Sequence, residues 1–248
     1  MMRYVLVIGV VLSATLHMHA TTNQELFLRA NKQYQSGYYD QALCQFTLIT
    51  HKTSAVLYNM GLCSYQLGNY AHALWAFKQA LRMATSRALM DATEHNLEHT
   101  YNALGKTVPT TFGAQIVRSV QRLTVGTTIL QWQLILLMLM YILVALFVWR
   151  QRPRWRTAVL VAGAICCVGV FMVFAVKRTA ASVSAAIVVT KELPVCSGPY
   201  QDCHAQGTIS YADEVTVLKT HKNWCKVRYG TIMGWVPQES ILLLTQEM

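Results

Sequence analysis

The segments Gly37-Tyr38-Tyr39-Asp40-Gln41-Ala42-Leu43 and Gly68-Asn69-Tyr70-Ala71-His72-Ala73-Leu74 are two copies of one pattern. They align at an offset of about 31 residues, and the same offset relates Phe46 to Phe77. Each leading glycine is expected to end a helix in the left-handed conformation. The small alanines would let two helices approach closely, and the phenylalanines would fill the space between units. The pattern therefore predicts stacked pairs of helices.

This pattern resembles the tetratricopeptide repeat, and residues 57–81 are the better copy. The offset is shorter than the usual period of about 34 residues, so we expect a trimmed turn between units. Residues 86–104 are expected to form a closing helix, which gives a helical array over residues 21–105. Its candidate ligand-binding residues are Tyr34, Tyr38 and Tyr65, which could face a concave peptide-binding surface. Ordinary packing between helices is the alternative for each.

The N-terminal residues 1–20 have the order of a secretory signal. Arg3 precedes an apolar run that is too short to span a bilayer, and Ala20 is an acceptable residue before a cleavage site. Met18 is a poor residue at the position where small side chains are preferred. We therefore expect export, with the cleavage position left open.

The basic residues responsible for the net charge of +10 lie beside the apolar segments. Residues 21–105 carry six basic and five acidic side chains, and residues 179–248 carry five and six. No basic patch is then expected on a folded domain to neutralise phosphates, so nucleic acid is excluded as a partner. The hydrophobic fraction of 54% and the charged fraction of 13% favour contact with a lipid bilayer instead.

Two long apolar segments, 129–149 and 157–177, are each long enough to cross a bilayer. The loop 150–156 between them contains four arginines, so it is expected in the cytoplasm. The chain would then cross the cytoplasmic membrane twice, with both outer regions in the periplasm. The preceding residues 106–128 are either a plain linker or an amphipathic helix on the membrane surface.

From residue 186 the apolar pattern becomes that of short strands separated by turns. The expected strands are Ile187-Val188-Val189, Glu214-Val215-Thr216-Val217-Leu218, Trp224-Cys225-Lys226-Val227-Arg228, Gly234-Trp235-Val236 and Ile241-Leu242-Leu243. Together with Gly198-Pro199, they resemble the bacterial SH3 domain over most of residues 186–248. The resemblance implies a small all-β barrel. Its candidate ligand-binding residues are Tyr200, Tyr211 and Trp235, although strand tryptophans are often buried in a core.

The order of the modules resembles the BatE proteins of the Bacteroides aerotolerance group. The fold class is a multidomain membrane protein with a helical repeat array, two transmembrane helices and an SH3-like barrel. The resemblance implies a scaffold that acts with envelope membrane proteins, among them von Willebrand factor A-type partners. A peptidoglycan peptide is a further candidate ligand of the barrel.

One segment is compatible with enzymatic chemistry, His95-Asn96-Leu97-Glu98-His99. It matches the H-x-x-E-H pattern of inverted zinc peptidases, in which two histidines bind zinc and the glutamate activates water. Its place on the closing helix of a small array favours a solvated helix face. We therefore expect no enzyme, metal or cofactor. Stoichiometric zinc that is lost on His99→Ala would favour the membrane-peptidase alternative.

The seven cysteines fall into different environments. Cys196 and Cys203 bracket a barrel loop in an oxidising compartment, so a disulfide is possible there, although spacing alone does not settle the geometry. Packing is expected for Cys166, Cys167 and Cys225. For Cys44 and Cys63, on successive helices of the repeats, packing is favoured over a disulfide between them.

Overall fold

The computed structural model describes residues 22–108, 185–200 and 203–244, together with isolated positions between 119 and 163. Several predicted segments lie outside the described residues. They are the signal at 1–20, most of the linker at 106–128, most of both apolar segments at 129–149 and 157–177, and the loop at 150–156. Among the helices that the described residues form, none has the length and apolar character of a membrane crossing.

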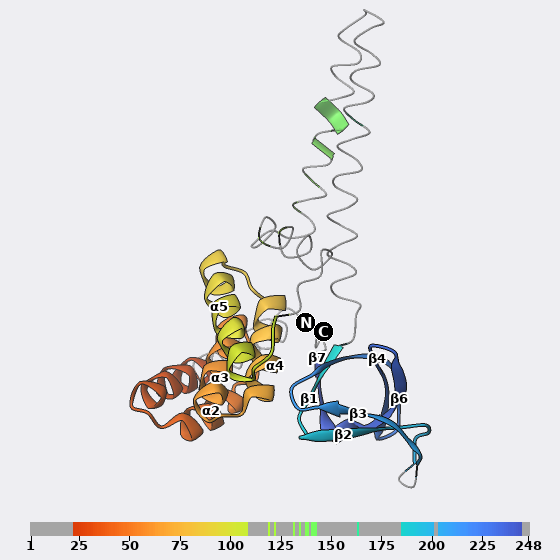
Figure 1. The fold of residues 1–248 in the computed structure, drawn as a ribbon. Coiled ribbons are helices and arrows are strands. Elements are labelled where there is room, and N and C mark those ends of the chain that lie inside the picture. Colours follow the sequence, from red (N-terminus) through yellow and green to blue (C-terminus); the bar gives the residue numbers. More distant parts are fainter. Residues whose placement is uncertain are drawn as a thin grey trace, which may run out of the picture. The chain divides into compact units, whose positions relative to one another are not determined.

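The N-terminal region is entirely helical in its described part (Figure 1). A first helix covers residues 22–35. It is followed by α2 (Tyr39–Leu48), α3 (Ser54–Gln66), α4 (Tyr70–Arg82) and α5 (Arg87–Ala103). Helix α5 agrees with the predicted closing helix.

The two predicted helix ends have the same backbone geometry. Gly37 and Gly68 have φ angles of 81° and 74°, as the pattern predicts. The residue after each glycine, Tyr38 or Asn69, has φ −83° and ψ 65°. Its N–H donates to the carbonyl five residues earlier, that of Gln33 at 3.0 Å or Ser64 at 2.9 Å. The sequence repeat is therefore a repeat of helix–turn–helix structure.

The core of the helical region contains the repeated residues. Ala42, Ala73, Phe46 and Phe77 are all fully buried, which confirms their expected packing role. Gly61 on α3 lies against the Phe77 ring, where a Cβ would come within 2.5 Å of Cε1. The Phe77 side chain of α4 therefore packs directly against the backbone of α3 at Gly61.

The C-terminal region is a seven-stranded antiparallel sheet (Figure 1). The strands lie in the order β3-β2-β6-β5-β4-β1-β7. Their bounds are β1 (Ala185–Val188), β2 (Glu192–Cys196), β3 (Ala205–Ser210), β4 (Glu214–His221), β5 (Trp224–Tyr229), β6 (Ile232–Pro237) and β7 (Ile241–Leu244), with a 3₁₀ turn at Gln238–Ser240 before β7.

The predicted strand segments overlap β1, β4, β5, β6 and β7, while β2 and β3 are not among them. Strand β3 lies at an end of the strand order and has few β-branched residues. One of its residues, Gly207, lies under Ile232 of β6. A Cβ atom at Gly207 would come within 2.9 Å of Ile232 Cδ1. Tertiary contact therefore favours a strand where local propensity is weak.

Candidate functional site

The described residues 22–84, 88–108, 185–200 and 203–244 belong to one compact unit, which contains both the helical region and the barrel. A shared apolar cluster joins them. Leu74 and Phe77 of α4 and Tyr101 of α5 belong to the same buried cluster as Ile187 of β1 and Leu244 of β7. No sequence pattern predicts this docking, because the helical residues and the barrel residues of the cluster are more than 80 positions apart along the chain.

One face of α4 makes the polar contacts to the barrel. The Trp75 Nε1–H donates to the Leu243 carbonyl at 2.8 Å, and Arg82 Nη1 donates to the Leu244 carbonyl at 2.5 Å. Between them, Lys78 forms an ion pair with Glu214 of β4. These α4 residues are three or four positions apart, so they lie on one side of the helix. Burial lowers the pKa of Lys78, but the charges of Glu214 and Tyr101 and the hydrogen bonds to them together outweigh burial and leave this pKa raised.

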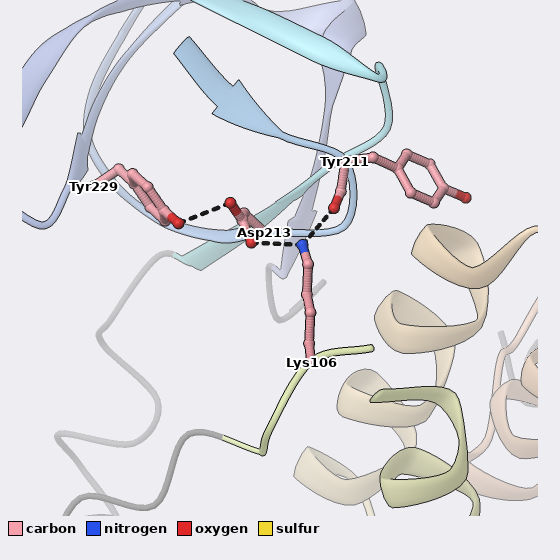
Figure 2. A network of polar contacts seen from close by, with 4 residues as sticks. All are labelled: Lys106, Tyr211, Asp213 and Tyr229. Carbon is pink, nitrogen blue, oxygen red and sulfur yellow. Dashed lines mark hydrogen bonds and ion pairs between the residues drawn. The ribbon is translucent and has the colours of Figure 1, made fainter. Parts of the chain in front are cut away.

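The start of α4 is also bound by the barrel. The Ala71 N–H belongs to the first helical turn, where no carbonyl within the helix can accept it. It donates to the Tyr211 hydroxyl at 3.0 Å. Tyr211 was predicted as a ligand contact, and the structure places its ring toward the helices (Figure 2). Its hydroxyl is therefore engaged in the docking of the two regions.

A second polar network lies after α5 (Figure 2). Lys106 Nζ donates to the Tyr211 carbonyl at 2.5 Å and to Asp213 Oδ1 at 2.6 Å. The Tyr229 hydroxyl donates to Asp213 Oδ2 at 2.7 Å. Both carboxylate oxygens of Asp213 therefore have a donor, and the hydrogen bond to Asp213 raises the pKa of Tyr229.

The outer face of the barrel carries a separate aromatic group on β4, β5 and β6. Trp224 and Trp235 are half-buried and alternate with the buried Cys225 and Val236, so they face away from the core. The rings of His221 and Trp235 pack edge to face with centroids 6.4 Å apart. Trp235, predicted either as core or as a ligand contact, therefore lies on the outer face.

A disulfide-closed loop lies next to this face. Cys196 pairs across the sheet with Trp235 and is bonded to Cys203, with 5.4 Å between the two Cα atoms. The spacing of the two cysteines alone left this disulfide open, and the structure contains it. Within the loop, Tyr200 is 55% exposed, and its ring occupies the space beside Gly198 where a side chain would otherwise lie. Tyr200 is thus presented to solvent by a short covalently closed loop.

The tyrosines predicted on the helical array divide into two kinds. The Tyr34 ring packs against that of Tyr39 at 5.3 Å, and Tyr65 packs against Tyr70 at 5.6 Å in the equivalent place one repeat later. Burial raises the pKa of Tyr34. Tyr38 is 59% exposed and remains the more accessible candidate.

The His95–Glu98–His99 segment lies on the exposed surface of α5. The Nε2 atoms of the two histidines are 3.1 Å apart and their rings meet edge to face. In the described residues, no group of three or more His, Cys, Asp or Glu side chains is arranged to hold a metal ion.

The three free cysteines of the described regions behave differently. Cys63 and Cys225 are buried, which agrees with their predicted packing, and burial raises the pKa of Cys63 to about 11. Cys44 is exposed, so its predicted packing was wrong: the buried side of α2 is formed by Ala42 and Phe46, and Cys44 lies off that side.

Comparison with known protein families gives one match. Residues 192–241 match the bacterial SH3 domain. A comparison of the chain with curated proteins gives no match. The matched range contains the aromatic outer face and the disulfide loop, but it excludes β1 and nearly all of β7, which contact α4. Residues 192–241 therefore match a bacterial SH3 domain, and the two strands that meet the helices lie almost entirely outside the match.

Proposed function

We propose that this protein is a non-enzymatic scaffold of the cell envelope, in which a protein-binding helical array and a peptide- or cell-wall-binding barrel act as one docked unit. The bacterial SH3 domain indicates a protein- or cell-wall-binding role for the barrel. The apolar hairpin at 129–177 anchors the unit in the cytoplasmic membrane, with both folded regions in the periplasm.

The observation that carries this proposal is the docking of α4 and α5 against the barrel. It joins Lys78 to Glu214 and Lys106 to Asp213, and it includes a shared apolar cluster. A fixed arrangement reduces the entropy lost when one partner contacts both regions at once. The partners proposed for the helical array are von Willebrand factor A-type membrane proteins of an aerotolerance complex, on the basis of the module order.

The test is recovery of such a partner after cross-linking in native membranes. Lys78→Ala combined with Lys106→Ala removes both ion pairs between the regions and should lower recovery several-fold. The control combines Lys32→Ala with Lys191→Ala, because these lysines are exposed and lie outside the docking contacts. It should leave recovery unchanged. Equal recovery from both double variants would contradict a role for the docked unit.

A second pair of variants separates the folded regions from the membrane segment. Replacement of both apolar spans by an unrelated charge-free hairpin, with the arginine loop kept, should preserve recovery. Deletion of residues 23–104 should abolish it. Loss of recovery on the hairpin replacement alone would place the binding surface in the membrane.

A further inference from the structure

The outer face of β4, β5 and β6 carries positive charges without acidic partners among the described residues, although residues 179–248 as a whole are nearly neutral. Lys219 of β4 lies directly opposite Lys226 of β5, and Arg228 lies two residues further along β5 on the same face. Like charges directly opposite each other destabilise an antiparallel pair. The described residues form no ion pair with any of these three side chains.

The acidic residues of the barrel are placed elsewhere. In the described strands β4, β5 and β6 the only acid is Glu214, which pairs with Lys78 of the helical region. The neighbouring Asp213 is held by Lys106 and Tyr229. Docking therefore uses the negative charge on one side of the barrel and leaves the lysine face positive. This corrects the sequence-based expectation that no basic patch lies on a folded domain.

Apolar surface adjoins these charges. Trp235 lies opposite Lys226 in the sheet, and Met233 lies opposite Arg228 and is 44% exposed. A bound group should therefore place a carboxylate near the two lysines and an aromatic or apolar side chain on Trp235. Adjacent acidic and aromatic side chains of an extended peptide supply both.

We propose that this outer face, defined by Lys219, Lys226, Arg228, Met233 and Trp235, binds an extended acidic peptide segment of a partner protein. The inference rests on the proposed binding role of the barrel and names its ligand. A carboxylate between Lys219 and Lys226 removes their mutual repulsion, and the adjacent Trp235 ring covers the apolar part of the peptide. Charge complementarity of this kind gives specificity and a salt-dependent association rate.

The test uses the full chain in a nonionic detergent and a fluorescein-labelled peptide with the repeat Glu-Tyr-Glu-Gly. Fluorescence anisotropy should show binding that weakens with added NaCl. A matched peptide with Gln in place of Glu should bind about tenfold more weakly. Lys219→Gln combined with Lys226→Gln should cause a similar loss. Lys32→Gln combined with Lys191→Gln changes the net charge equally and should have no effect.

Three outcomes would overturn the inference. They are no binding of the acidic peptide, an equal loss in both double variants, and binding to phosphatidylglycerol vesicles without binding to the peptide. The last result would assign the face to the membrane surface. If cross-linked partner recovery still depends on docking in any of these cases, the scaffold proposal stands and only the ligand assignment fails.

Discussion

At the scale of single residues, Gly61 of α3 lies directly against the Phe77 ring of α4. The glycine hydrogen faces a fully buried ring, and a methyl group there would overlap its edge. Gly37 and Gly68 are predictable from the sequence because each begins a repeated segment. Gly61 is not predictable in this way, because the need for a small residue there arises from a ring 16 positions away in the chain.

We expect Gly61→Ala to destabilise the protein. Glycine inside a helix costs roughly 0.5–1 kcal/mol relative to alanine, so the helix itself would gain. Overpacking of a core costs about 1–3 kcal/mol, and Phe77 is enclosed, so the loss should be larger than the gain. Thermal unfolding followed by circular dichroism measures the difference. Ala88→Ser adds one atom at an exposed site of α5 and is the control. A raised melting temperature for Gly61→Ala would show that the Phe77 ring can move aside.

At the scale of elements, α4 packs on two sides. Its Ala73 and Phe77 are fully buried at repeat positions, in the apolar cluster that the helices share with the barrel. Trp75, Lys78 and Arg82 make the polar contacts with the barrel. The repeat pattern predicts the first set because those positions recur one unit earlier. The second set has no such signal, because a tryptophan or lysine on a helix is equally compatible with a solvated face.

In the barrel, too, the elements follow a sequence pattern but the roles of individual aromatic residues do not. Strands with alternating β-branched and aromatic residues were predicted, but the aromatic side chains of the barrel could not be assigned to a face from the sequence. Tyr211 and Trp235 were equivalent candidates, and the structure places Tyr211 against the helices and Trp235 on the outer face. The pairing register and the docking contacts decide between the two positions. Neither can be read from local composition.

We expect Tyr211→Phe to lower stability by about 0.5–1.5 kcal/mol, because it removes the acceptor of the Ala71 N–H. Urea unfolding of the full chain, followed by tryptophan fluorescence, gives the midpoint. The matched control is Tyr200→Phe, which removes the same hydroxyl from an exposed ring and should stay within about 0.5 kcal/mol of the native chain. If the two variants unfold alike, the Tyr211 hydroxyl does not stabilise the start of α4.

At the scale of the whole molecule, the docked unit is assembled from two ends of the chain. The helical part ends at residue 108 in the described structure, and the barrel begins at residue 185. Strands β1 and β7, which contact α4, lie at the two ends of the barrel sequence. The bacterial SH3 match excludes β1 and nearly all of β7, so knowledge of the family alone would not predict the docking.

Reporter fusions test the proposed topology. Fusions at Gly105 and at Met248 should report the periplasm, and a fusion near Pro153 should report the cytoplasm. This outcome follows from the arginines of the 150–156 loop, because positively charged loops remain inside. A cytoplasmic barrel together with a periplasmic helical region would overturn the topology.

The contacts of Tyr211 with Ala71 and of Lys106 with Asp213 also restrict how the intervening segment can cross a membrane. Two regions can touch only if they share a compartment, so a segment that leaves one and returns to the other must cross an even number of times. This restriction on parity is independent of hydropathy and of the arginine count. One crossing, or three, would separate α4 from β1 and β7 by the full thickness of the bilayer.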